Sequence, residues 1–354
     1  MLRKILSSVI TMFSLNATSA QDSSSTSSFA ISGSADEYYR YDFGKSKPNN
    51  LTSFTNSHNS FELGMASLKL GYKTSQVEMV ADLGFGKRAQ EFSYNDNGIL
   101  AAIKQLYISY SPKDWLKFTA GSWATHVGYE LMDAPLNRNY SMSYMFTNGP
   151  FFHMGIKAEL THNTSGFMIG IANPTDFKYV PDGFINKKFF IAQYSFAPSD
   201  YFKAYLNYVG GKNIDTTSSD QFDLVLTSKL GSKFSLGYNG TVNRTKKYLG
   251  NKIFDDTKSW WGSAVYLNLD PSSKFALTLR GEYFNDDNQL KVYSSQLQGG
   301  SVFSTTLSTN LKTDHFIFIP ELRWDKASQS IFINKHGDAK KNAANILFAA
   351  IYHF

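Results

Sequence analysis

Apolar and polar residues alternate along most of the chain in segments of roughly ten residues. In 274–283, Phe275, Leu277 and Leu279 fall on one side of an extended chain, and charged and hydroxyl side chains fall on the other. Successive side chains of a β-strand point to opposite faces, so this alternation predicts strands. No helical periodicity of useful length competes with it.

Sixteen such segments can be marked, and most match the 9–11 residues that a transmembrane β-strand needs. They lie near 29–41, 58–72, 76–86, 101–111, 115–128, 151–162, 165–173, 187–197, 201–210, 219–229, 233–244, 258–269, 274–285, 301–311, 315–326 and 342–354. An even number lets the last strand pair antiparallel with the first, which leaves no sheet edge with unpaired backbone groups. The pattern therefore predicts an all-β fold, an antiparallel transmembrane up-and-down β-barrel of about 16 strands over residues 29–354.

The connections between these segments alternate between short and long. The short ones follow the even segments and are rich in turn-forming residues, as in Pro112-Lys113-Asp114. The long ones follow the odd segments, near 42–57, 87–100, 129–150, 174–186, 245–257, 286–300 and 327–341, and only the connection near 211–218 is short. Outer-membrane barrels have short periplasmic turns and long outside loops, so both termini are expected in the periplasm.

Aromatic residues concentrate at the ends of the segments. Near the short turns stand Tyr72, Tyr110, Trp115, Phe196, Phe202, Phe234, Phe275 and Phe316. Near the long loops stand Phe61, Trp123, Phe151, Phe189, Trp260, Trp261, Phe303 and Trp324. Two aromatic girdles favour a membrane barrel over a soluble β-sandwich, which would alternate in the same way.

The N-terminus has the features of a secretory signal peptide. Arg3 and Lys4 form a positive region, 5–15 is moderately apolar, and Thr18-Ser19-Ala20 offers small residues for cleavage. We expect a signal peptide over 1–20, then a Ser-rich lead-in over 21–28; the alternative is a short amphipathic start to a soluble protein. The chain is thus expected to be exported by a bacterium.

Composition narrows the function further. The chain has no cysteine, which excludes disulfides, cysteine-based zinc sites, a thiol nucleophile and a lipoprotein anchor. Beyond the N-terminus it has no apolar run of 18 residues, which excludes helical membrane spans. The formal charge of +6 is small and scattered, so no nucleic-acid partner is expected.

The familiar catalytic, nucleotide and metal motifs are missing, and the seven histidines share no metal-ligand spacing. We therefore expect no enzyme activity, no cofactor and no metal. Two alternatives stay open. One is an outer-membrane hydrolase, for which His126 near Ser122, or His153 with Asp133, offer candidate groups. The other is a surface adhesin or receptor that binds a partner through loops such as 286–300 and 327–341.

Several short pieces carry a family resemblance. They are Val127-Gly128-Tyr129-Glu130, Phe152-His153-Met154-Gly155, Glu321-Leu322-Arg323-Trp324-Asp325 and Ile351-Tyr352-His353-Phe354. In these the chain resembles the β-barrel porins of the OmpL-like type, common in Bacteroidetes. The resemblance implies passive transport of small hydrophilic solutes across the outer membrane of a Gram-negative bacterium. A final strand that ends in Phe354 also resembles the signal by which such barrels meet their assembly machinery in the lipid bilayer. Whether the chain forms a homo-oligomer stays open.

The alternation also assigns an inner face to each strand. By parity Arg40, Lys69, Lys117, Lys157, Lys203, Lys229, Arg280 and Arg323 face inward, with Asp36, Glu78, Asp82, Glu159, Asp223, Glu282, Glu321 and Asp325. Such a mixture is costly in a dry core, so we expect water inside, and a sixteen-stranded barrel is wide enough for a channel. Eight basic and eight acidic residues predict weak ion selectivity.

The connection 129–150 is the longest and is rich in apolar residues such as Met132, Tyr140 and Phe146. We expect it to fold into the barrel as a constriction, with packing outside against a neighbouring protomer as the alternative. The candidates for pore-lining and constriction residues are Glu130, Asp133, Arg138, Lys157, Glu159, Lys203, Arg280, Glu282, Glu321 and Arg323.

Overall fold

The computed structural model describes residues 27–250 and 253–354. The expected signal peptide over 1–20 and most of the lead-in over 21–28 lie outside the described residues. The first strand begins at Ser28, which the sequence had assigned to the lead-in.

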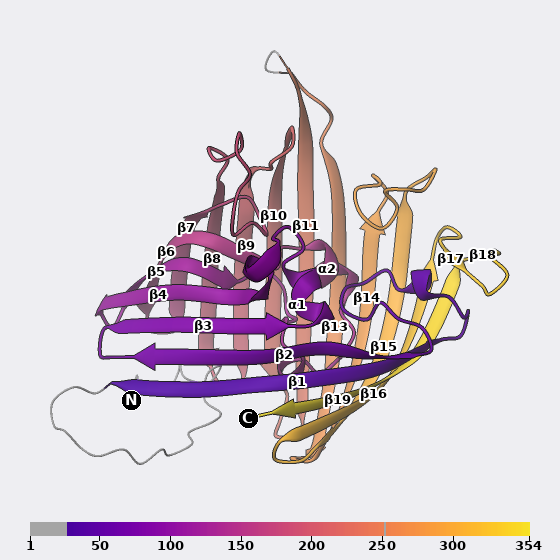
Figure 1. Ribbon diagram of the computed structural model, residues 1–354, viewed down its shortest axis with the longest axis horizontal. Helices are drawn as coiled ribbons and strands as arrows, with labels where there is room; N and C mark the ends of the chain where they lie inside the picture. The colour runs from indigo at the N-terminus through magenta and orange to yellow at the C-terminus, as the bar shows by residue number, and fades with distance from the viewer. Residues whose placement is uncertain (1–26, 251–252) are drawn as a thin grey trace.

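Within the described residues, sixteen long antiparallel strands form one closed barrel (Figure 1). The strands are β1 (Ser28–Asp42), β2 (Ser60–Lys73), β3 (Val77–Phe85), β4 (Ile103–Lys113), β5 (Leu116–Ala124), β6 (Phe152–His162), β7 (Ser165–Ala172), β8 (Phe189–Ser199), β9 (Phe202–Lys212), β10 (Thr217–Lys229), β11 (Phe234–Gly250), β13 (Lys258–Ser272), β14 (Phe275–Asp286), β15 (Gly300–Lys312), β16 (Phe316–Ala327) and β19 (Asn342–His353). Each pairs with its neighbours in the chain, and β1 pairs antiparallel with β19 to close the sheet. The predicted fold class is confirmed.

Two strands differ clearly from their predicted limits. β5 ends at Ala124 instead of 128, because the chain leaves the wall there to enter the interior. β11 runs to Gly250 instead of 244 and continues through the two-residue β12 (Ile253–Phe254) as a ribbon above the barrel. The extension joins a polar run, 245–247, to the apolar Tyr248 and Leu249, so the apolar and polar alternation that marks the other strands is absent from it. A separate two-stranded ribbon, β17 (Phe332–Ile333) with β18 (Ala339–Lys340), lies in the last long loop.

The outer face of the barrel is apolar, as expected for a wall in lipid. Tyr72, Tyr110 and Trp115 are exposed near the short turns, and Trp261, Phe303 and Trp324 are exposed near the long loops. Half of the predicted upper girdle is wrong, however, because Trp123, Phe151, Phe189 and Trp260 are buried inside the barrel. Trp260 and Trp261 are consecutive in β13 and so must face opposite sides, and the other three pack against loops that enter the interior.

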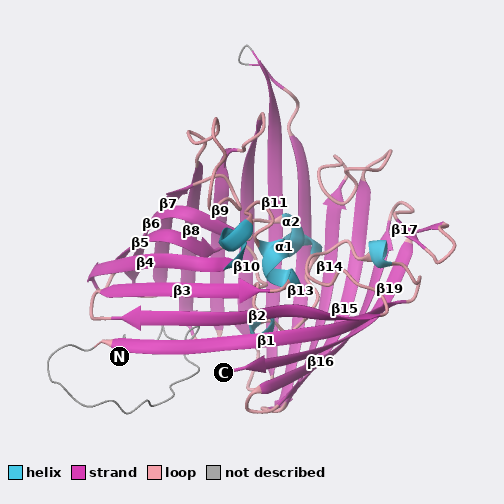
Figure 2. Ribbon diagram, viewed as in Figure 1, coloured by secondary structure: helices cyan, strands magenta, loops and turns pink. Residues whose placement is uncertain are grey.

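The helices of the described residues are short and lie in the long loops. They are η2 (Lys47–Asn49), α1 (Lys87–Phe92), η3 (Gly98–Ala102), η4 (Ala134–Leu136) and α2 (Tyr144–Asn148). Figure 2 draws α1 and α2 in cyan within the outline of the strands. None of the helices in the described ranges has the length and apolar character to cross a membrane.

Candidate functional site

The loop between β5 and β6, residues 125–151, lies inside the barrel and is fixed to the wall by inward-facing carboxylates. The Glu321 carboxylate on β16 accepts a hydrogen bond from the backbone N–H of Tyr140 at 2.8 Å. The Glu282 carboxylate on β14 accepts two, from the N–H groups of Tyr144 and Met145, both at 2.9 Å. Backbone N–H groups bonded to buried carboxylates hold a loop firmly, because neither partner has water as an alternative. The prediction that this loop folds into the lumen is confirmed.

Buried ion pairs join the loop to the same wall. Glu130 binds Arg280 on β14 at 2.5 Å, and Arg280 is fully buried. The other Glu130 contacts come from the Ser143 N–H and the Tyr266 hydroxyl. Arg323 on β16 pairs with Asp325 at 3.0 Å and donates to the Met142 carbonyl at 2.8 Å. Each of these buried charges is therefore paired with an opposite charge or a hydrogen-bonding group of the protein. Buried charges are tolerated in a dry interior only when they are paired in this way.

A second group of contacts fixes the other edge of the loop. Arg88 of α1 is fully buried, lies 3.9 Å from the Asp36 carboxylate and donates to the Met132 carbonyl at 3.1 Å. The Tyr140 hydroxyl donates to the same Asp36 carboxylate. Asp133, a predicted constriction residue, pairs with Lys104 on β4, which also binds Asp82 at 2.9 Å. Loop 86–102 therefore enters the barrel together with loop 125–151.

Three loops share one apolar cluster inside the barrel. Phe54 comes from loop 43–59, Phe92 from loop 86–102, and Met142 and Phe146 from loop 125–151, all nearly inaccessible to water. The sequence analysis missed the first two loops. Their aromatic and charged residues, Phe54 and Arg88 among them, were the available signal, since such residues are unusual in loops that stay in water.

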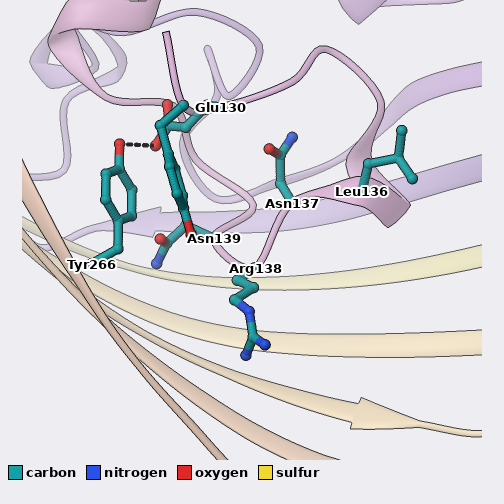
Figure 3. Close-up of a pocket in the computed structure, with 7 residues that line it drawn as sticks. Glu130, Leu136, Asn137, Arg138, Asn139 and Tyr266 are labelled. Atoms are coloured by element: carbon teal, nitrogen blue, oxygen red, sulfur yellow. Dashed lines mark hydrogen bonds between the residues drawn. The ribbon is translucent and has the colours of Figure 1, made fainter. Parts of the chain in front are cut away.

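A cavity of about 200 Å³ lies between the loop and the wall near the short-turn end of β13 (Figure 3). Tyr129 stacks on Tyr266 with ring centroids 4.1 Å apart, and it lies over Gly237 of β11. A Cβ at position 237 would come within 2.6 Å of the Tyr129 ring, so only glycine leaves this space. Arg138 extends away from Glu130 and forms a bidentate ion pair with Asp270, and both are about one-third exposed.

The remaining predicted site residues, Lys157, Glu159 and Lys203, lie on the opposite side of the lumen, where Lys117 joins them. Lys117 on β5 and Lys157 on β6 each approach the Glu159 carboxylate to 3.4 Å. Lys203 lies at the start of β9 and faces inward in register with Thr227. Exposure of the side chains is 39% for Lys117 and 30% for Glu159, against 0% for Arg280. The ten predicted residues thus divide into one set buried beneath the loop and one set in contact with water.

A narrow crevice separates the loop from β10 and β11. On the loop side it is lined by Gly128 and Met145, and on the wall side by Gln221, Asn239 and Thr241. Asp223 at its edge accepts hydrogen bonds from the Gly128 N–H and from the Asn207 and Asn239 amides. The sequence analysis did not select these uncharged wall residues, although the alternation of β10 and β11 places them inside.

The candidate hydrolase groups are not assembled into a catalytic arrangement. Asp133 is bound to Lys104, and the His153 ring bonds the Thr125 hydroxyl at 3.1 Å. Ser122 pairs in register with Leu106, which is on the outer face, whereas Trp123 and His153 face inward. In the residues that the structure describes, no group of three or more histidine, aspartate or glutamate side chains is placed to hold a metal ion.

At the long-loop end, two loops are locked together by buried polar contacts. Asp176 of loop 173–188 accepts hydrogen bonds from the N–H groups of Phe151 and Phe152, and Tyr94 of loop 86–102 donates to it at 3.0 Å. Burial raises the pKa of the Asp176 carboxyl to about 6, against the lowering effect of these donors. Lys178 pairs with Asp96 at 3.0 Å, and burial lowers the pKa of the Lys178 ammonium.

A closed antiparallel barrel with an apolar outer face, two aromatic ends and a polar interior entered by a loop is a transmembrane β-barrel of the channel class. The sequence model of the family described as "Putative beta-barrel porin-2, OmpL-like" matches residues 28–354, and the chain belongs to this family. It is an outer-membrane porin, a multi-pass barrel through which small solutes diffuse.

Solved structures have the same fold at low sequence identity. An anion-selective porin from Comamonas acidovorans gives a TM-score of 0.63 at 10% identity and covers 93% of this chain and 100% of that chain. OmpT of Vibrio cholerae gives 0.60 at 9% identity, covering 94% and 99%. The outer membrane channel DcaP of Acinetobacter baumannii gives 0.60 at 8% identity, covering 93% and 97%. No curated protein sequence matches the chain.

Proposed function

We propose that solutes pass along one side of the lumen only, past the inner faces of β5–β10 in their short-turn halves, which we name the open arc. The strands β13–β16, β19 and β1, which we name the packed arc, hold the loop 125–151. The observation that carries this proposal is the difference in exposure between inward charges: Lys117 and Glu159 are about one-third exposed, whereas Arg280 and Glu282 are inaccessible. A charge that water reaches is one that a hydrated solute meets.

Within this proposal the predicted site residues have two roles. Lys157, Glu159, Lys203, Arg138 and Asp133 contact the solute path. Glu130, Arg280, Glu282, Glu321 and Arg323 hold the loop that narrows it. The exposed pair of Arg138 with Asp270 lies at the short-turn mouth, which is the periplasmic side.

The test is electrical. Purified protein in planar bilayers is expected to give stepwise conductance increments, as each inserted barrel opens a water-filled path. A correctly folded barrel that stays silent at all applied voltages would contradict the proposal. We further propose that the protein has no catalytic activity, which activity-based labelling of the purified barrel checks: labelling of a specific serine would oppose it.

For assembly, we propose recognition of the last strand by the barrel-assembly machinery. Phe354 exchanges two backbone hydrogen bonds with Gly33 of β1, and the Phe354 ring lies against the Gly33 α-carbon, where a Cβ would come within 2.8 Å of it. Phe354→Ala is expected to reduce insertion in cells while the purified chain still folds in detergent. Equal insertion of the variant and the parent would oppose this role.

Two further proposals concern the mature protein. Cleavage after Ala20 is proposed, and N-terminal sequencing of the protein from outer membranes should begin at Gln21. Homo-oligomerisation is proposed because one structural relative is described in a trimer form, OmpT of Vibrio cholerae. Native gels of mildly extracted protein should give a band that heating converts to a monomer, and a single unheated monomer band would oppose it.

A further inference from the structure

The eight acidic and eight basic residues that face inward are not buried to the same extent. Of the eight acidic residues that face inward, six are at most 5% exposed: Asp36, Asp82, Asp223, Glu282, Glu321 and Asp325. Of the eight basic residues, only three are buried to that degree: Arg40, Arg280 and Arg323. Of these sixteen wall residues, the charges left in contact with water are five lysines, Lys69, Lys117, Lys157, Lys203 and Lys229, and two glutamates, Glu78 and Glu159. The loop adds Asp133, which is bound to Lys104.

The buried carboxylates bind protein donors, although Asp36 does so through one oxygen only. Glu321 and Glu282 hold the backbone of the loop, and Asp223 holds Gly128 N–H and two amides. Asp82 binds Lys104. A solute in the lumen cannot reach these oxygens, and the donors facing them offset part of their field.

The exposed lysines have fewer partners. Glu159 lies between Lys117 and Lys157 and neutralises one of the two. Glu78 lies opposite Lys73 across β2 and β3 at the periplasmic end. Among the described residues, no carboxylate lies within 4.0 Å of the ammonium of Lys69, Lys203 or Lys229. The Arg138–Asp270 pair at the mouth adds no net charge.

These lysines also lie at one level of the barrel. Lys203 is the second residue of β9, Lys117 is the second residue of β5, and Lys229 ends β10, all beside short turns. Lys69 lies four residues before the end of β2. They therefore line the periplasmic part of the lumen, below the loop. Charges of one sign along the wall of a pore attract ions of the opposite sign and raise their local concentration.

We propose that this porin prefers anions, and that the solutes it favours are small molecules that carry carboxylate or phosphate groups. The inference rests on the proposed path along the open arc. It replaces the expectation of weak selectivity drawn from equal numbers of inward charges, because the loop buries acidic residues more often than basic ones.

The experiment is the reversal potential of the intact protein in planar bilayers with a KCl gradient. We expect chloride to be favoured over potassium roughly two- to fivefold, the range that exposed charges give, and the preference to fade as salt screens them. Combining Lys157→Gln, Lys203→Gln and Lys229→Gln should bring the reversal potential toward zero, and Glu159→Gln should move it further to the anion side.

A matched control removes two lysines from the exterior. Lys335→Gln with Lys340→Gln, both exposed in loop 328–341, should leave the reversal potential unchanged. Stepwise conductance with a potassium preference, or with no preference, would overturn the inference and leave the porin function standing. A silent barrel would instead overturn the proposed function, and the inference with it. A shift in the control as large as that in the triple variant would also overturn the inference, since the selectivity would then come from the surface.

Discussion

The open arc and the packed arc are built from the same kind of strand, but inward-facing charges of the packed arc such as Glu282 are buried and those of the open arc such as Glu159 are exposed to water. On β14 and β16 the carboxylates of Glu282 and Glu321 bind backbone N–H groups of the loop and are inaccessible to water. On β6 the carboxylate of Glu159 binds two lysines and stays exposed. The alternation of side chains along a strand determines whether a residue faces inward. Whether an inward charge is buried or lines the pore depends on where the loop covers the wall.

The largest contrast is expected from removing one inner cation on each arc. Arg280→Met leaves Glu130 buried without its ion partner, and breaking a buried pair typically costs about 3–5 kcal/mol. Lys203→Met removes a partly exposed lysine that forms no ion pair with any described residue, and it should change stability by less than about 0.5 kcal/mol. Urea unfolding of the refolded barrel measures both. Similar losses for the two variants would mean that the arcs do not differ in packing.

Introducing an arginine tests both which face of the wall a residue occupies and whether the inner face is packed or open. Leu277→Arg, outward on β14, should cost about 2–4 kcal/mol if it lies near the middle of the bilayer. Thr278→Arg, inward on the packed arc, should cost about 1–3 kcal/mol, because Thr278 is 1% exposed and bonded to Asn268. Its inward position alone would have suggested that this substitution has little effect on stability.

The matched change on the open arc is Thr161→Arg, which faces inward opposite Gly166. It should alter stability by less than about 0.5 kcal/mol, since the arginine can extend into water. The same unfolding assay applies to all three variants. If Thr161→Arg destabilised the barrel as much as Thr278→Arg does, the inner face of β6 would be packed as tightly as that of β14, and the assignment of the two arcs would be wrong.

Shortening the loop should make the two arcs alike. Replacing Ala134–Asn148 with a brief Gly/Ser linker removes the segment that covers Glu282, Glu321 and Arg323, and water can then hydrate these charges. Single-channel conductance should rise, and larger sugars should enter proteoliposomes. Unchanged conductance together with loss of an oligomer on native gels would favour packing of the loop outside the barrel.

The smallest effect concerns the contact of Asp176 with the start of β6. The pKa of Asp176 is raised from 3.8 to about 6 in the folded protein, so the neutral carboxyl favours the folded loop. Its contribution is complete below about pH 4 and is lost as the pH rises through about 6. Hydrogen exchange at the Phe151 and Phe152 amides, corrected for intrinsic rates, should become less protected from pH 5 to 7. Asp176→Asn should abolish this trend; protection that increases over the same range would reverse the assignment.

The sequence predicted the wall well and the interior poorly. Strand limits, the alternation of short and long connections, and the inward position of residues such as Lys157 and Glu282 all follow from local rules of strand geometry and turn chemistry. The apolar content of 129–150 was enough to predict that this loop enters the lumen, because a loop so rich in apolar and aromatic side chains is unfavourable in water.

The division between the arcs could not be predicted from local rules. It depends on contacts between residues far apart in the chain, such as Tyr140 with Glu321 and Arg88 with Asp36. Three aromatic residues assigned to the girdle, Trp123, Phe151 and Phe189, were wrong for the same reason, because they pack against loops inside the barrel. Trp260 could have been excluded from strand parity alone, since Trp261 faces outward. Equal counts of charge predict weak selectivity, whereas the burial of those charges is the basis of the anion preference that we propose.

Cysteine accessibility tests the central claim most directly, since the chain has no cysteine of its own. Single cysteines at Lys157 and Lys203 on the open arc, and at Thr306 and Ser308 beneath the loop on β15, are exposed to a charged thiol reagent during single-channel recording. The division of the lumen predicts that modification at 157 and 203 changes the current within the recording, whereas 306 and 308, both 0% exposed, stay unmodified. Rapid reaction at 306 and 308 with none at 157 and 203 would contradict it.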